Sequence, residues 1–312
     1  MPSADFLISL RERFLDIVSG SDRALALNSS TDPSIRYGLG LRDSQVTAPD
    51  VAPQVGGPTA ELASLLREIL SSGLVDRDEN VDYAALRTNP LYDDFRRCTG
   101  KLRAFDPSAL PDRNVRLAFW INLYNLLVLE GVMALQVQRS IMEQRAGMAF
   151  LRQAAYLVDG QRMSCDDIEH GILRANRGHP FYPGKQFGLS DPRLKWVIKS
   201  LDARIHFALN CASRSCPPIR GYTPENLNSQ LELATRSYLA TDVQIMPEEN
   251  ALYLSPIFKW FAKDFGGRDG VIDFILSHHL DGAELFWLSK ERDGVSLRYK
   301  PYDWSLNRKA QT

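Results

Sequence analysis

The residue types best suited to chemistry lie together between residues 201 and 220, in the sequence LDARIHFALNCASRSCPPIR. This stretch holds His206 together with Cys211 and Cys216, two of the four cysteines of the chain. A cysteine thiol becomes a nucleophile when a nearby base removes its proton, and histidine is the side chain that most often serves as that base. The composition of the stretch therefore predicts a thiol-dependent site with Cys211 as the nucleophile.

The apolar pattern of residues 204–210 predicts a half-buried β-strand that carries His206. The prolines after Cys216 break regular structure, because proline has no N–H to donate and the residue before it avoids the helical region. On a straight strand His206 and Cys211 are separated by about 16 Å, so they pair only if the chain folds back between them. His170, which lies on a different predicted element, is therefore an equally good candidate for the base.

The spacing of His206, Cys211 and Cys216 is His-x4-Cys-x4-Cys, which matches none of the usual Cys-x2-Cys zinc patterns. We expect no metal, because these residues supply three ligands at most and a fourth would have to come from His170 or water. A disulfide between the two cysteines is geometrically conceivable, and in a reducing compartment it would be a redox switch rather than a structural link.

The chain has no Gly-x-Ser-x-Gly elbow, glycine-rich phosphate loop or His-Glu-x-x-His helix. We therefore expect no cofactor, and the sequence disfavours a serine hydrolase, a nucleotide-dependent enzyme and a zincin.

The most apolar segment of the chain, residues 117–135, approaches the length and hydropathy of a membrane span. It contains Asn122, Asn125 and Glu130, and polar groups are costly in hydrocarbon unless they face a protein interior or a cavity. We therefore predict that it is the central helix of a soluble core and that the chain has no membrane span. Asn122 and Asn125 share one face of this helix, where they either hold neighbouring backbone groups or orient a catalytic group.

A second helix is predicted after a hairpin turn at Asp159-Gly160. Ser164 and Asp167 match the capping-box pattern, with aspartate in place of glutamate, so residues 165–174 should be helical. Residues 176–192 form a long loop rich in glycine, proline and aromatic residues, of the kind that often serves as a lid or a binding loop. The later patterns predict a helix from Thr223-Pro224, a short strand at 252–254, an aromatic-rich helix at 256–265 and a helix at 271–280.

The bulk composition favours a cytoplasmic protein. The chain carries 37 basic and 38 acidic residues, so its formal net charge of −1 favours binding neither to nucleic acid nor to an anionic surface. The charges scattered over residues 1–20 predict an amphipathic helix rather than a secretory signal. Residues 21–58 have the composition of a flexible linker or arm, and residues 59–312 are predicted to form a single globular domain. Four cysteines without an export signal indicate free thiols in a reducing compartment.

Five separated motifs follow one another along the chain: LAFWINLYNLLVL (117–129), SCDDIEHGILR (164–174), DARIHFALNCASRSCPPIR (202–220), SPIFKWFAKDF (255–265) and YDWSLN (302–307). Together they resemble the family called domain of unknown function 547, over roughly residues 80–307. In that family the region occurs in bacterial proteins and in plant proteins with an added leucine zipper. No heptad array precedes it here, so the resemblance implies no zipper-mediated partner. The motif positions that it implies are Asn122, Tyr124, Asn125, Glu169, His170, Arg204, His206, Cys211, Cys216 and Pro217.

The sequence thus predicts an α+β fold, a helix-dominated single domain in which a small β-sheet containing residues 204–210 packs on the central apolar helix. The leading functional interpretation is a thiol-dependent hydrolase or transferase that acts on a small molecule or a peptide. In this interpretation Cys211 is the nucleophile and His206 or His170 is the base. The residues expected to orient the base, to bind the oxyanion or to bind the substrate are Asn125, Asn122, Tyr124, Glu169, Arg204 and Cys216. The alternative is a non-catalytic domain that binds a protein or a ligand and in which the same Cys, His and Asn residues are structural.

Overall fold

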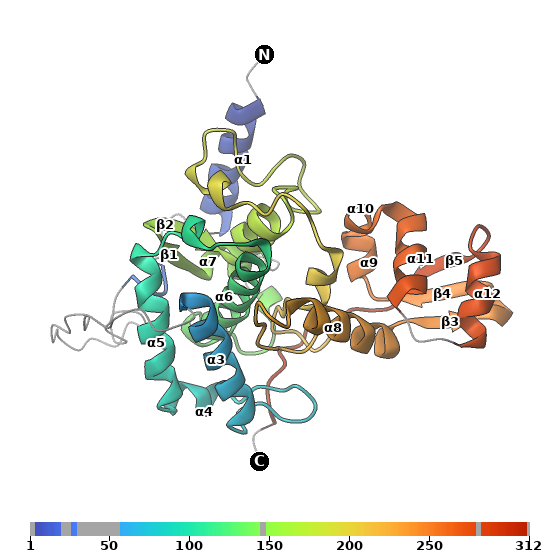
Figure 1. Cartoon of the computed structure of the whole chain (residues 1–312), viewed down its shortest axis with the longest axis horizontal. Helices are drawn as coiled ribbons and strands as arrows, with labels where there is room; N and C mark the ends of the chain where they lie inside the picture. The colour runs from blue at the N-terminus through green and yellow to red at the C-terminus, as the bar shows by residue number, and fades with distance from the viewer. Residues whose placement is uncertain (1–3, 20–25, 30–56, 144–147, 279–281, 311–312) are drawn as a thin grey trace.

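A computed structural model describes the chain apart from residues 1–3, 20–25, 30–56, 144–147, 279–281 and 311–312 (Figure 1). Most of the linker predicted at 21–58 lies outside the described residues, whereas the N-terminal helix is present as α1 (Ala4–Ser19). Helices predominate in the described part of the chain, and its paired strands form two small sheets. This architecture confirms the predicted fold class.

The helix α6 (Arg113–Ala134) is the centre of the larger part of the molecule (Figure 1). Its N-terminus is capped by Asp112, whose side chain accepts hydrogen bonds from the backbone N–H groups of Asn114 and Val115. The helix is long and apolar enough to cross a membrane, yet 94% of its most apolar window is buried inside the protein. This burial is what the predicted central core helix requires, because a helix that is apolar all round needs protein on every side.

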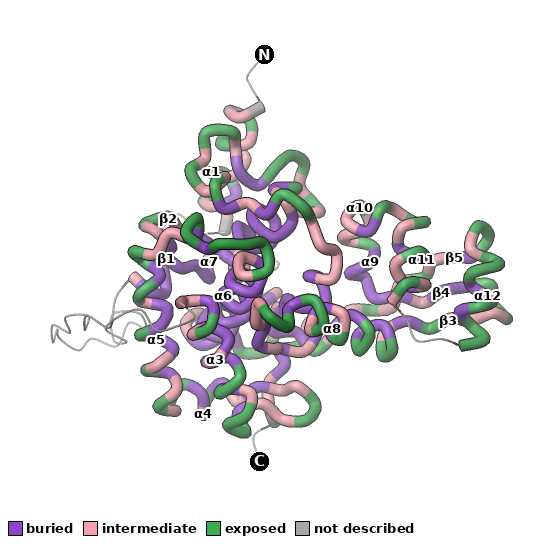
Figure 2. Tube along the Cα trace, viewed as in Figure 1, coloured by how far each residue is buried: buried purple, intermediate pink, exposed green. Residues whose placement is uncertain are grey.

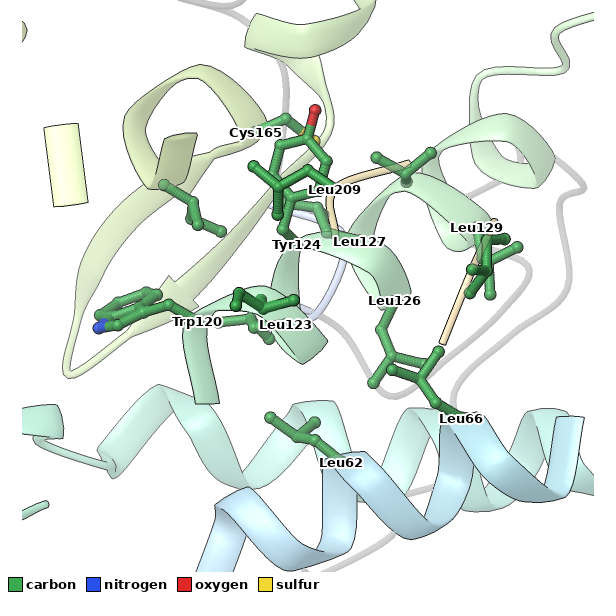
Figure 3. Close-up of a cluster of buried hydrophobic side chains, with 14 of the residues drawn as sticks. Leu62, Leu66, Trp120, Leu123, Tyr124, Leu126, Leu127, Leu129, Cys165 and Leu209 are labelled. Carbon is green, nitrogen blue, oxygen red and sulfur yellow. The ribbon is translucent and has the colours of Figure 1, made fainter. Parts of the chain in front are cut away.

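The helices α3 (Gly57–Ser71) and α4 (Tyr83–Thr88) are among those that pack directly on α6, and α5 (Leu91–Lys101) packs on both of them. Figure 3 shows Leu62 and Leu66 of α3 directed toward α6. Burying each such leucine contributes about 1.5–3 kcal/mol. The apolar residues of α3 that recur at helical spacing, Leu62, Leu65, Leu66 and Ile69, are therefore all buried.

The hairpin predicted at Asp159-Gly160 is confirmed by β1 (Ala155–Val158) and β2 (Gln161–Ser164), which pair in antiparallel register. The two turn residues have φ values of 46° and 69°, and positive φ at both positions is what a two-residue hairpin turn requires. The hairpin follows the short helix α7 (Met148–Gln153), on which α1 packs. It also contacts α6, so this sheet is the one that packs on the central helix.

The capping box after the hairpin is confirmed as well. The backbone N–H of Asp167 donates to Ser164 Oγ, and the backbone N–H of Ser164 donates to Asp167 Oδ2. The helix that follows is η5 (Asp167–Leu173), and it is wound as a π-helix. Here the backbone N–H of Arg174 reaches the carbonyl of Glu169, five residues earlier. Single π-helical turns are rare and are frequently found at functional sites.

Residues 204–210 do not form the predicted strand, and this part of the prediction is wrong. The segment contains a 3-10 helix, η7 (Ala203–Phe207), whose first turn is capped by the Asp202 side chain. The backbone N–H of Ala208 then donates to the carbonyl of Ile205. These local hydrogen bonds satisfy backbone groups that a sheet would otherwise have paired.

The second sheet has three strands in the order β3 (Gln244–Met246), β4 (Ala251–Leu254) and β5 (Ser296–Tyr299). Strand β4 is antiparallel to β3 and parallel to β5. The helix α8 (Leu227–Asp242) comes before this sheet in the chain, and it begins after Asn226 rather than at the predicted Thr223. The strand predicted at 252–254 is therefore confirmed as part of β4.

The helices after β4 differ from the prediction in two respects, and one of them is that the helix predicted at 271–280 begins four residues earlier, as α11 (Gly267–His278). The aromatic helix predicted at 256–265 is divided at Phe261 into α9 (Ile257–Trp260) and α10 (Ala262–Phe265). Gly266, with a φ of 99°, ends α10 as predicted. The remaining helical segments are α12 (Ala283–Glu291), η1 (Leu102–Ala104), η2 (Pro107–Ala109), η3 (Ile141–Glu143), η6 (Pro192–Trp196) and η8 (Pro247–Glu249).

The buried apolar side chains form two clusters, one around α6 and one between α8, α9, α11, α12 and β4. Figure 2 shows burial along α6, and burial alternating with exposure along α8. Ile205 belongs to the first cluster and Phe207 to the second. The residue between them, His206, therefore lies where the two clusters meet.

Candidate functional site

A pocket of about 110 Å³ brings together six of the nine residues that the sequence assigned to a site, namely Tyr124, Glu169, His170, His206, Cys211 and Cys216. The predicted lid loop contributes His179, Pro180 and Phe181 to its wall. The other lining residues are Leu151, Leu209, Pro217, Ile257, Trp260, Phe261, Tyr302 and Trp304. The pocket is therefore built from segments of both hydrophobic clusters, with η7 between them.

His206 is held in this pocket by a carboxylate that the sequence reasoning did not single out. The imidazole is 1% exposed, and its Nε2 lies 3.0 Å from Oδ2 of Asp264 on α10. Burial would raise the pKa of Asp264, but hydrogen bonds from His206 and Arg174 outweigh it and hold that pKa well below its ordinary value. Burial lowers the pKa of His206, and Asp264 opposes this only in part. His206 is therefore a neutral imidazole near pH 7, with its Nε2 proton directed to Asp264 and Nδ1 left as the basic nitrogen.

His170 has a different electrostatic environment. Its Nδ1 lies 3.1 Å from Nη1 of Arg174. A guanidinium group only donates hydrogen bonds, so this ring nitrogen must be the acceptor. Burial, together with the charges of His179 and Arg174, lowers the pKa of His170 well below its ordinary value. Of the two histidines considered for the base, His206 has the more favourable surroundings.

Glu169 adds a carboxyl group that changes its charge near neutral pH. The Tyr124 hydroxyl donates a hydrogen bond of 3.2 Å to Glu169 Oε2. Burial raises the pKa of Glu169 to about 7, although Arg174 and Tyr124 act in the opposite direction. A group with such a pKa can donate or accept a proton near pH 7. Figure 3 shows the Tyr124 hydroxyl at the end of the core cluster where Cys165 and Leu209 also lie.

The two cysteines of the pocket are joined by a disulfide, with their Cα atoms 6.1 Å apart. The expectation of free thiols is therefore wrong for Cys211 and Cys216. A turn brings them together, because Ala212 has a positive φ of 64° and the backbone N–H of Cys216 donates to the carbonyl of Ser213. The other two cysteines, Cys98 and Cys165, are free and buried.

The sulfur atoms of the disulfide have unequal surroundings. Sγ of Cys216 lies 3.0 Å from the backbone nitrogen of Cys211, 3.1 Å from Ser213 Oγ and 3.2 Å from the Tyr302 hydroxyl. Sγ of Cys211 is 3.3 Å from the same Ser213 oxygen and 3.7 Å from the Tyr302 hydroxyl. Hydrogen-bond donors stabilise a thiolate, so reduction of this disulfide would leave the more stabilised thiolate on Cys216.

Asn122 and Asn125 do not line the pocket, and their amides hold backbone instead. Nδ2 of Asn125 donates to the carbonyl of Ala208 and its Oδ1 accepts from the backbone N–H of Asn210, both at 3.0 Å. Asn122 makes the same pair of bonds with the backbone of Tyr222. These contacts are the ones expected if the two asparagines hold neighbouring backbone groups rather than orient a catalytic group. The clamp by Asn125 fixes the backbone that leads directly into the disulfide loop.

Arg204 also lies outside the pocket lining. Its guanidinium group binds the Asp202 carboxylate at 2.8 Å and the Asn228 side chain at 2.7 Å. It therefore links η7 to α8 rather than contacting the cavity.

Asp166, His170 and His179 offer ligand atoms that all lie within 4.8 Å of one another. Two cations already approach this group, since Arg174 contacts His170 and Nη1 of Arg152 lies 3.8 Å from Asp166 Oδ2. The Arg174 contact also places the proton of His170 on Nε2, the nitrogen nearer to Asp166, and a metal there would have to displace it. The geometry therefore fits a buried polar network that includes the two arginines better than a metal centre.

Two residues that sequence reasoning missed are Tyr302, which lines the pocket, and Asp264, which holds His206 from outside the lining. Both lie inside motifs that carried the resemblance, SPIFKWFAKDF and YDWSLN. The motifs therefore already pointed to the two segments that contain these residues, but no local pattern distinguished Asp264 or Tyr302 from its neighbours.

Comparison with known proteins gives one match. Residues 107–239 match the model of the family described as "Protein of unknown function, DUF547". No curated protein and no solved structure matches the chain. The matched segment contains α6, η5, η7 and the disulfide loop, and it ends before α9 and α10. Residues 107–239 are therefore similar to the DUF547 family, whose function is unknown, and this match lies within the region where the motifs indicated the resemblance.

Proposed function

We propose that this pocket is the active site of a thiol-dependent hydrolase or transferase that works when the Cys211–Cys216 disulfide is reduced. The observation that supports it most directly is that His206, which lines the same pocket as Cys211, is paired with the buried carboxylate of Asp264 at 3.0 Å. A nucleophile, a base and a group that orients the base are the parts that covalent catalysis requires. The carboxylate fixes one imidazole nitrogen and leaves the other to act as the base.

In the proposed reaction, Cys211 Sγ attacks the carbonyl carbon of an ester, a thioester or an amide, and His206 Nδ1 accepts the thiol proton. The bond from the carbonyl carbon to the leaving group then breaks, and the leaving group takes this proton. Water, or a second nucleophile in the case of a transferase, next attacks the acyl-cysteine while His206 again accepts a proton. The cysteine leaves as a thiol when that proton returns to sulfur.

Two neighbours of the sulfur atoms have supporting roles in this proposal. Burial raises the pKa of Tyr302 well above its ordinary value, so its hydroxyl stays protonated. It lies 3.7 Å from Cys211 Sγ and is the donor that we assign to the developing oxyanion. Cys216, with its three nearby donors, is the better leaving thiolate in disulfide exchange, which makes it the resolving cysteine of the pair.

The wall of the pocket favours a small apolar acyl group. The rings of Trp260, Tyr302 and Trp304 lie within 5.5 Å of one another, measured between centroids. Such a wall stabilises apolar groups by burial, and a cavity of about 110 Å³ limits their size.

The test uses the full chain, reduced with dithiothreitol, and p-nitrophenyl acetate as the acyl donor. The expected result is a burst of p-nitrophenolate and one acetyl group attached to Cys211, located by peptide mass spectrometry. Cys211→Ala should abolish the burst, and His206→Gln should slow it by a factor of about 10²–10⁴, the usual contribution of a general base. The matched control is Cys98→Ala, which removes a free and buried thiol and should leave the burst unchanged. Acetylation that persists in Cys211→Ala would refute the proposed nucleophile.

A non-catalytic ligand-binding domain is the second candidate function. The observation that favours it is the disulfide itself, which keeps both sulfur atoms from acting as nucleophiles. Under this alternative, oxidised and reduced protein bind an apolar ligand equally well. No acyl-cysteine forms in either state, so the experiment above separates the two candidates.

A further inference from the structure

A groove that shares no lining residue with the pocket lies at the C-terminal end of the described chain. Its volume is about 560 Å³. Basic side chains from three separate segments line it: Arg139 from the loop after α6, Arg214 from the disulfide loop, and Arg308 and Lys309 from the C-terminal segment. The carboxylate of Asp303 lines it as well.

The positive charge of this groove is only partly compensated within the protein. Arg139 has a partner, because its Nε lies 3.3 Å from Glu143 Oε1. Among the described residues, Arg214, Arg308 and Lys309 form no ion pair within 4.0 Å, although the charge of Arg214, after the hydrogen bonds from Ser305, contributes to the lowered pKa of Asp303. In a chain with a formal net charge of −1, these cations form a local surface that attracts anions.

The backbone that carries these side chains is fixed by hydrogen bonds between the three segments. The backbone N–H of Arg214 donates to the carbonyl of Ser305, and that of Leu306 donates to the carbonyl of Arg139. Nη2 of Arg308 also donates to the carbonyl of Val137, 3.0 Å away. A ligand therefore has to order side chains but not the backbone, which lowers the entropic cost of binding.

We propose that this groove binds a soluble phosphate-bearing small molecule. The planar guanidinium groups of Arg214 and Arg308 suit the oxygens of a phosphate, with which arginine forms paired charge-assisted hydrogen bonds. The groove is open to solvent, so a bound anion would be held by the charges of these side chains rather than by enclosure. In a glycine-rich phosphate loop the backbone N–H groups bind the phosphate, whereas in this groove the proposed contacts come from basic side chains. The proposal does not depend on thiol chemistry in the pocket.

The experiment is a calorimetric titration of the full chain with inorganic pyrophosphate at physiological ionic strength. Arg214→Gln and Lys309→Gln should each weaken binding by about tenfold or more, since a hydrogen bond to a charged group is worth about 1.5–3 kcal/mol. Lys309→Arg keeps the charge and should keep most of the affinity.

Lys290→Gln is the matched control, because Lys290 is an exposed lysine on α12 outside the groove. It should bind pyrophosphate as the wild type does, and circular dichroism should show that every variant remains folded. The proposal is overturned if wild type binds no pyrophosphate at millimolar concentration. It is also overturned if Arg214→Gln and Lys309→Gln bind as tightly as Lys290→Gln.

Discussion

Asp264→Asn should destabilise the protein strongly, because one buried carboxylate is the partner of two buried basic side chains, Arg174 and His206. Arg174, whose side chain is 5% exposed, approaches it at 2.5 Å, and His206 approaches at 3.0 Å. Its third partner, Arg177, is 46% exposed, so that pair adds at most about 1 kcal/mol. Removing one partner of a buried ion pair costs about 3–5 kcal/mol, because the remaining charge stays buried without compensation. We expect a loss of this size for the variant, measured as the free energy of unfolding by urea in the presence of reductant.

The matched control is Asp269→Asn, which removes an exposed carboxylate paired with Arg268 at 2.9 Å. The control should lose no more than about 1 kcal/mol. The reasoning is refuted if the two variants have the same stability, since Asp264 would then not compensate a buried charge.

The pH dependence gives a second measurement on the same variant. The folded-state pKa of Asp264 lies below its unfolded value of about 3.9, so its contribution is complete above that pH and is lost as the pH falls further. Wild type should therefore lose stability below about pH 4, and Asp264→Asn should lack this part of the acid transition. The pKa of His206, followed by NMR, should fall in the variant, because Asp264 is the group that raises it.

Three further predictions concern other parts of the site. Burial raises the folded-state pKa of Glu169 to about 7, so wild type should lose roughly 2–4 kcal/mol between pH 5 and pH 8, whereas Glu169→Gln should lose much less in urea unfolding. Asn125→Leu should cost on the order of 1–3 kcal/mol for each backbone group left without its partner, measured as a lower urea midpoint. Iodoacetamide should label no cysteine in the folded oxidised protein and two after reduction, Cys211 and Cys216, because the other thiols are buried and have raised pKa values. Mass spectrometry would contradict this last prediction by finding label on a buried cysteine before reduction.

The features that could be predicted from the sequence are those decided within a few residues. The capping box of Ser164 and Asp167 and the turn at Asp159-Gly160 need only the local backbone and their own side chains. The periodic leucines of α3 and the long, mainly apolar run of α6 predict their helices in the same way, because the spacing of apolar residues indicates which positions are buried.

The segment around His206 could not be predicted locally, because its conformation depends on distant groups. The apolar pattern of residues 204–210 suits a strand, yet the Asp202 cap and the clamp from Asn125 on α6 together hold it in tight turns. The disulfide depends on Ala212 in a left-handed conformation, which alanine seldom adopts. No pattern in the sequence predicts the left-handed conformation of Ala212.

The pairing of His206 with Asp264 is the hardest feature to read from the sequence, and the reason lies in the fold. Glu169 and His170 are carried by η5, which packs on the cluster around α6, whereas Asp264 lies on α10 beside the second cluster. His206 stands between the two because its neighbours along the chain belong to different clusters. His206 and Asp264 therefore meet only when the two clusters pack together. A substitution that loosens this packing should impair the pocket even when each cluster remains folded, which distinguishes such a site from one built on a single helix or strand.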